Sequence, residues 1–193
     1  METPLWKRWA KLYLTGLLLM AAAWFLAFHL LPPGSVRLPG THLLIPGYAG
    51  TPLVEAGRIF LVNLVSFLAI LLANRILRIR EFGYGSLVVL AWMILYGLLL
   101  GTGSFGAGGS PLPPGLHVFS RSGVWELGAG ALFAVSTWRV ALHMSPGLRT
   151  PSQPVSRQER GKLTRQEVAG IVLSLIVLAA AAGREAWMIR SLY

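Results

Sequence analysis

The sequence predicts an all-α polytopic membrane protein, a bundle of five or six transmembrane helices that forms a single integral membrane domain over residues 1–193. Composition is the first indication. Hydrophobic residues make up 54% of the chain and charged residues 12%, and the mean hydropathy is +0.62, so polar groups are too few to cover a soluble globule. The other two indications are long apolar runs and the basic residues found in every second connection between these runs.

Five apolar runs are long enough, or nearly so, to cross a hydrocarbon core that needs about 20 helical residues. They lie at about 11–32, 57–75, 84–104, 122–142 and 166–190. The first run follows a basic segment, as a signal peptide does. Its apolar stretch is long for that role and the following LPPGS is a poor cleavage site, so we expect a retained anchor. The fifth run is the weakest, because Gly183 and Arg184 interrupt it.

Capping residues indicate where two of the helices begin. Thr51 has the character of an N-cap with Pro52 at the first helical position, ahead of the second run. Thr164 and Glu167 form the Thr-x-x-Glu pattern of a capping box before the fifth run. The polar segment 145–165, which ends at this box, is predicted to be a cytoplasmic loop.

Basic residues orient the predicted spans. Three segments hold at least eleven of them: Lys7, Arg8 and Lys11; Arg75, Arg78 and Arg80; Arg149, Arg157, Arg160, Lys162 and Arg165. The intervening connections hold only Arg37, Arg58 and Arg121. The positive-inside rule then predicts a cytoplasmic amino terminus and an outer carboxyl terminus. Arg184 and Arg190 favour a different arrangement, in which the fifth helix is only half inserted.

Several classes of function find no support in the sequence. The net charge is +10, but the basic residues lie between apolar runs and not on a soluble face, so we expect no nucleic-acid binding. The chain has no Cys, and its four His share no ligand spacing, so no metal or cofactor site is expected. Ser122 and Gly123 resemble a serine-protease motif only superficially, because no histidine base is identified. We expect no enzymatic activity.

Glu126, in the fourth run, is the main candidate for a functional residue, because an intramembrane ionisable group is costly unless it has a role. Its helical face continues with small or polar residues: Gly130, Ala134, Thr137 and Ala141. Three structural interpretations compete with a functional one. Glu126 lies at the interface, complements the positive helix end, or pairs with Arg121.

The second run carries polar residues on one helical face, Asn63, Ser66 and Asn74. They serve either as hydrogen-bonding contacts between helices or as part of a substrate path. We expect Glu126 to face the bundle interior and to accept hydrogen bonds from Asn63, or to pair with Arg58 or Arg121.

Small residues predict close helix packing. Gly97 and Gly101 form a small-xxx-small pair in the third run. In the fourth run, Gly130 is a small residue on the helical face that carries Glu126, and it lets another helix come close to that face. Such pairs are common in a chain with 22 Gly. They favour helix packing and give no evidence of dimerisation, although a homo-oligomer stays open.

Three stretches together resemble a known family. They are FLVNLVSFLAILLAN with Asn63, GLLLGTGSF from Gly97, and SGVWELGAGALFAVSTWRVAL with Glu126. This pattern, over about residues 55–145, is similar to the stage II sporulation protein M family of bacterial membrane proteins. Members commonly read His-Gly-x-x-Glu-Leu where this chain has Gly123, Glu126 and Leu127, and Ser122 stands where the His is usual.

The resemblance implies a polytopic, non-enzymatic protein of the bacterial cytoplasmic membrane. In spore formers the family works in a complex that remodels peptidoglycan during engulfment. We therefore expect a scaffold or accessory subunit whose partners are the lipid bilayer and other membrane or envelope proteins. The alternative is a small transporter or permease-like subunit, in which Asn63, Ser66, Glu126 and Thr137 line a polar path.

Overall fold

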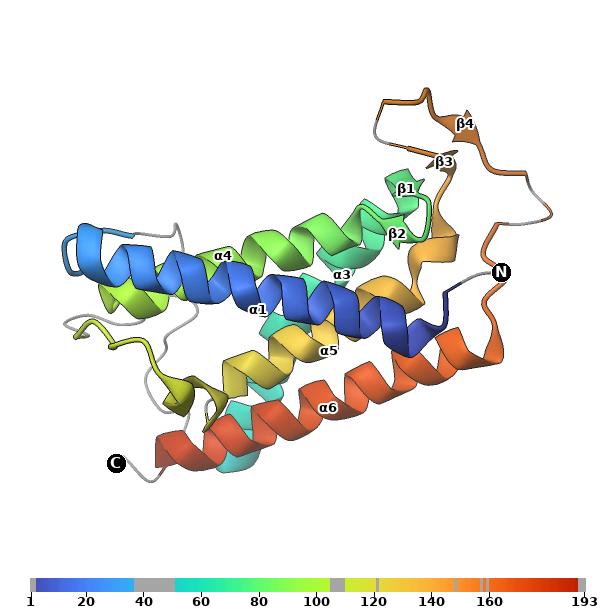
Figure 1. Cartoon of the computed structure of the whole chain (residues 1–193). Helices are drawn as coiled ribbons and strands as arrows, with labels where there is room; N and C mark the ends of the chain where they lie inside the picture. The colour runs from blue at the N-terminus through green and yellow to red at the C-terminus, as the bar shows by residue number, and fades with distance from the viewer. Residues whose placement is uncertain are drawn as a thin grey trace.

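The computed structural model describes residues 3–36, 51–104, 110–120, 122–147, 149–156, 158 and 160–190. Five α-helices within these residues run up and down to form a bundle, and the first and last described residues lie at opposite ends of it (Figure 1). The helices are α1 (Leu5–Leu30), α3 (Pro52–Ile76), α4 (Gly85–Thr102), α5 (Ser122–Ser136) and α6 (Arg165–Arg190). The all-α bundle predicted from the sequence is confirmed.

Four of the helices are long and apolar enough to cross a membrane. They are Leu5–Leu30, Pro52–Ile76, Gly85–Thr102 and Arg165–Met188. Large apolar side chains stay exposed along them, for example Leu61, Val65 and Leu72 on α3. Such a surface is stable in lipid and not in water, so the chain is a multi-pass membrane protein whose helices contact lipid.

The fourth predicted span, 122–142, ends earlier than the sequence indicates. Helix α5 stops at Ser136 and is followed by a short 3-10 helix, Trp138–Val140. Its 15 residues cover only about 22 Å, less than a hydrocarbon core. The hydropathy of the sequence does not reveal this end, because the apolar residues after Ser136 pack inside the protein: Trp138 and Ala141 are 4% and 0% exposed.

Helix α5 is the central helix of the bundle. Helices α1, α3, α4 and α6 all pack against it (Figure 1). Its second half is almost wholly buried, and Phe133 of α5 stacks on Phe67 of α3 with 4.7 Å between ring centroids. Because its neighbours cover it, α5 does not need the length of a lipid-exposed span.

The predicted helix starts at Thr51 and Thr164 are confirmed. The Thr51 hydroxyl accepts a hydrogen bond from the Val54 N–H at 3.4 Å, with Pro52 as the first helical residue. At α6, Glu167 accepts from the Thr164 N–H at 2.8 Å while the Thr164 hydroxyl accepts from the Glu167 N–H at 3.2 Å, which is a complete capping box.

A small sheet covers one end of the bundle, where α1 and α6 begin (Figure 1). Its strands are β1 (Leu77–Ile79), β2 (Phe82–Gly83), β3 (His143–Ser145) and β4 (Gln153–Pro154). The order is β2-β1-β3-β4, and β1 pairs with β3 in parallel while the outer pairs are antiparallel. The segments 75–81 and 145–165, expected to be connections only, therefore contribute strands. We call this end of the bundle the sheet end.

Glycines set the distance between α1 and α4. A Cβ added at Gly97 would lie 2.3 Å from the carbonyl oxygen of Met20, and one at Gly101 would lie 2.7 Å from the backbone nitrogen of Phe28. Any side chain at either position would push the two helices apart. The pair Gly97 and Gly101 thus lies directly at a helix-helix contact.

Candidate functional site

A polar cluster lies near the first turns of α5, at the end of the bundle opposite the sheet. Ser122 is buried, and its hydroxyl donates a hydrogen bond to Oε2 of Glu185 on α6 at 2.5 Å. One turn later, Glu126 interacts with the Glu185 carboxylate and with the side chain of Asn63 on α3. Three helices therefore bring two carboxylates and one amide together.

The structure places Asn63 and Glu126 next to each other, as the sequence argument expects. Asn63 is half-buried, and its amide Nδ2 also donates to the backbone carbonyl of Ile59, one turn earlier on α3, at 3.1 Å. Glu126 is half-buried as well, but its Oε1 is fully enclosed and accepts no hydrogen bond from the described residues. A buried carboxylate oxygen without a donor is costly, so a donor group that reached this atom would stabilise the site.

A groove of about 530 Å³ leads to this cluster between α3, α4 and α5. Asn63, Ser66, Tyr96 and Glu126 form its polar part. Apolar side chains form the rest of its wall: Val62, Val65, Phe67, Val89, Trp92, Leu95, Leu99 and Leu127. Since Val65 is 68% exposed, the groove borders the lipid-facing surface of α3.

Gly130 also lines the groove, one turn beyond Glu126. A Cβ added there would lie 3.6 Å from Cδ1 of Ile70, which is an ordinary contact distance. Gly130 thus keeps the groove open without being required for a close helix approach, unlike Gly97 and Gly101.

Thr137 does not join the cluster around Glu126. It lies beyond the last turn of α5, about 16 Å further along the bundle, and its hydroxyl accepts a hydrogen bond from Nδ2 of Asn74 at 2.8 Å. Asn74 is fully buried; it also donates to the Ala134 carbonyl at 2.9 Å and accepts from the Gly85 N–H at 2.7 Å. These bonds join α3, α4 and α5, so Thr137 and Asn74 hold the helices together.

Of the two basic residues considered as partners of Glu126, Arg58 forms an ion pair with Glu55, one turn earlier on α3. Glu55 is 1% exposed, while the Arg58 side chain is 30% exposed. Arg121, the other candidate, lies outside the described residues.

Sequence reasoning missed Glu185, the second carboxylate of the cluster. Its signal is present in the spacing of α6, where Glu167, Gly170, Ser174 and Leu178 recur every three or four residues and are buried. Glu185 continues that stripe by a further two turns. The exposed neighbours Gly183 and Arg184 suggest a helix end and obscure the stripe.

The chemistry available here is proton or cation exchange and hydrogen bonding. Two ionised carboxylates in contact repel strongly where water is scarce, so a proton, a cation or a donor group stabilises the pair of Glu126 and Glu185. Among the described residues, no group of three or more His, Cys, Asp or Glu side chains is placed to hold a metal ion.

Comparison of the chain with protein-family models, with curated proteins and with solved structures finds no match. The site must therefore be interpreted from its own residues.

Proposed function

We propose that this protein is a non-enzymatic scaffold or accessory subunit that receives a transmembrane helix of a partner protein in the groove beside Glu126. One observation carries the proposal: the enclosed Oε1 of Glu126 has no donor among the described residues, and Glu126 lines a groove that borders the lipid-facing surface. A carboxylate in that setting is stabilised by a donor that comes from outside the chain.

The groove suits a helix better than a small polar molecule. Its wall is formed mostly by apolar and aromatic side chains, and intramembrane helix pairs gain from close packing plus an interhelical hydrogen bond. We infer a partner helix with apolar side chains and one donor, such as a Ser, Asn or Lys, at the depth of Glu126.

The resemblance to the stage II sporulation protein M family supports the same role. Asn63 and Glu126, which belong to different family-like stretches of the sequence, meet at this groove. We extend the proposal to a bacterial cytoplasmic membrane, with the sheet end facing the cytoplasm and an envelope protein as the partner.

Site-specific photo-crosslinking tests this proposal. A photoreactive residue at Val65, at the exposed side of the groove, is expected to crosslink a discrete membrane protein in native membranes. The matched control is the same residue at Leu18 on α1, which is 74% exposed and outside the groove, and is expected to crosslink lipid only. The crosslink at Val65 should disappear in Glu126→Leu while the melting temperature in detergent shows folded protein. A crosslink that persists in Glu126→Leu would contradict docking through the carboxylate.

The adjacent carboxylates favour a second candidate function. Glu126 and Glu185, in contact, are a pair that can share and pass on a proton within the membrane, which suits a small transporter or permease-like subunit. Reconstituted liposomes would then show proton or cation flux that Glu126→Gln abolishes without loss of folded protein. Absence of flux in the unmodified protein would exclude this candidate.

A further inference from the structure

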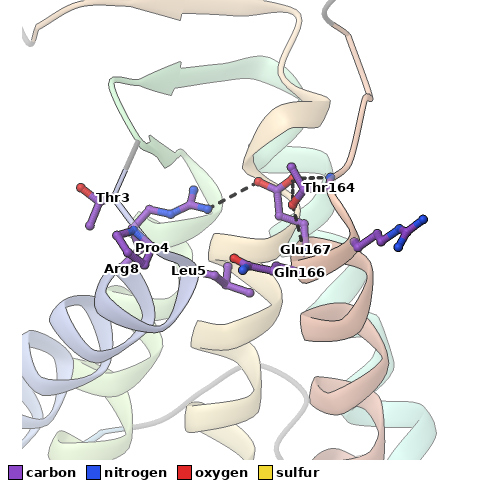
Figure 2. Close-up of a pocket in the computed structure, with 8 residues that line it drawn as sticks. Thr3, Pro4, Leu5, Arg8, Thr164, Gln166 and Glu167 are labelled. Atoms are coloured by element: carbon purple, nitrogen blue, oxygen red, sulfur yellow. Dashed lines mark hydrogen bonds and ion pairs between the residues drawn. The ribbon is translucent and has the colours of Figure 1, made fainter. Parts of the chain in front are cut away.

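A second cavity, of about 410 Å³, lies at the sheet end between the first residues of α1 and the first turn of α6 (Figure 2). Its lining residues are Thr3, Pro4, Leu5, Arg8, Thr164, Arg165, Gln166 and Glu167. It shares no lining residue with the groove beside Glu126. The cavity joins two helix starts, so two chain segments far apart in the sequence build it.

Arg8 is the most unusual group in this cavity. The residue is 5% exposed, yet Nε and Nη1 of its guanidinium have no hydrogen-bond partner among the described residues. Its Nη2 donates to Oε1 of Glu167 at 3.4 Å (Figure 2). The guanidinium lies 4.8 Å from the centre of the Trp138 ring. An arginine stays charged even when buried. Two unsatisfied nitrogen atoms of a buried cation therefore point to a missing acceptor.

Glu167 does not fill that need, because donors from several sides already occupy its two oxygens. Oε1 accepts from Trp138 Nε1 at 2.6 Å and from Arg139 Nε at 3.0 Å, in addition to Arg8. Oε2 accepts from the backbone N–H and the hydroxyl of Thr164 at 2.8 and 3.1 Å. The carboxylate is thus engaged by the capping box and by the side chains of Trp138, Arg139 and Arg8. Nε and Nη1 of Arg8 are therefore left for another anion.

The start of α6 adds further donors to the same cavity. The capping box uses the N–H groups of Thr164 and Glu167, but the first helical N–H groups, of Arg165 and Gln166, have no acceptor within the helix. A helix start also carries a partial positive charge that favours anions. The exposed Arg165 side chain adds a second cation to the lining of the cavity.

We propose that this cavity binds a phosphate group, with Arg8, Arg165 and the first N–H groups of α6 as its ligands. A guanidinium fork and a helix N-terminus together are the donors that phosphate oxygens accept best. Two sources share this chemistry, the head group of an anionic phospholipid and free inorganic phosphate. The site lies at the ends of two membrane-spanning helices, and Trp6 in the first turn of α1 is 65% exposed, as interfacial aromatic residues are. This depth favours the lipid.

The test uses the purified full-length protein in a neutral detergent, with binding followed by native mass spectrometry. The three probes are short-chain phosphatidylglycerol, a diacylglycerol with the same acyl chains but no phosphate, and inorganic phosphate. We expect one tightly held phosphatidylglycerol per chain and no specific retention of the diacylglycerol. If inorganic phosphate competes with phosphatidylglycerol at equal concentration, the phosphate site stands and its source is the soluble ion.

Substitutions connect this binding to the cavity. Arg165→Ala should weaken phosphatidylglycerol binding about fivefold, the loss expected for one basic residue at an anionic surface. Arg8→Lys should weaken it more, because lysine keeps the charge but lacks the fork. Arg184→Ala is the matched control, since Arg184 is exposed at the far end of the same helix. Equal binding by the unmodified protein, Arg165→Ala and Arg184→Ala would overturn the proposal even if Arg8→Lys failed to fold, because Arg165→Ala tests it independently. No retention of either phosphate compound would also overturn it.

Discussion

The side-chain amide of Asn74 on α3 donates a hydrogen bond to the hydroxyl of Thr137, just beyond α5, at 2.8 Å. The same amide also bonds the Ala134 carbonyl and the Gly85 N–H. Asn74→Leu removes all three bonds, each worth roughly 0.6 to 2 kcal/mol between membrane helices. We therefore expect the free energy of unfolding to fall by about 2 kcal/mol or more, measured by reversible denaturation in detergent.

Asn63 provides the comparison for that change, because it is the same residue type on the same helix but is only half-buried. Asn63→Leu should destabilise the protein less than Asn74→Leu does. An equal loss in both variants would mean that the bonds of Asn74 do not hold the three helices together.

Gly97 and Gly183 should respond to alanine in opposite directions. A methyl group at Gly97 meets the backbone of α1 at 2.3 Å, whereas nothing lies within 4 Å of the corresponding position at Gly183. Overpacking typically costs about 1 to 3 kcal/mol, so Gly97→Ala should lower the melting temperature. Gly183→Ala should leave it unchanged or raise it, since alanine favours a helix over glycine by up to about 1 kcal/mol. A tolerated Gly97→Ala would show that α1 and α4 pack less closely than described.

The proposed orientation is testable because the chain contains no cysteine of its own. Ser110 and Ser152 are both exposed, at the end of the bundle opposite the sheet and at the sheet end respectively. In intact cells, an impermeant thiol reagent should label Ser110→Cys and should label Ser152→Cys only after the membrane is permeabilised. The reverse pattern would invert the topology derived from the basic residues.

The beginning of the chain should respond to acid through Glu81, in the turn between β1 and β2. Hydrogen bonds from the side chain and from the backbone N–H of Thr3 hold the pKa of Glu81 below its ordinary value of 4.5, and the backbone bond measures 2.9 Å. A lowered pKa in the folded protein means that these bonds stabilise it above pH 4.5 and are lost as the pH falls through the lowered value. Carboxyl NMR titration should show this lowered midpoint.

Thr3→Pro removes both donors and should return the Glu81 midpoint toward its ordinary value. Thr3→Val, which removes only the hydroxyl, should give an intermediate midpoint. If the midpoint of Glu81 were the same in all three proteins, Thr3 would not be the cause of its low pKa.

Most of the helical framework could be predicted from the sequence, because membrane-spanning runs are long and their caps are local. Thr51 and Thr164 mark helix starts through residues only three positions away. The sheet could not be predicted in this way. Its strands are two or three residues long, and β1 pairs with β3 across more than 60 positions, so no local alternation of polar and apolar residues indicates it.

The candidate site was predicted in part, for a related reason. Asn63 and Glu126 each lie on a polar face of a predicted helix, and adjacent antiparallel helices bring such faces to one depth. Thr137 was predicted on the same helical face as Glu126, but it lies just beyond the end of α5 and serves a different contact. Glu185 and Arg8 depend on which helices pack together, which hydropathy does not determine.

The position of α5 has a consequence for how the protein is made. A segment of 15 residues that carries a glutamate is too short and too polar to leave the translocation channel for lipid by itself. Its apolar and polar faces are both covered only once α1, α3, α4 and α6 are in place. Insertion of α5 is thus coupled to folding of its neighbours, α6 above all, which is synthesised last. Truncation of the chain before residue 165 would leave α5 without that cover. We expect quality-control proteases to degrade the truncated protein, because its central helix is exposed.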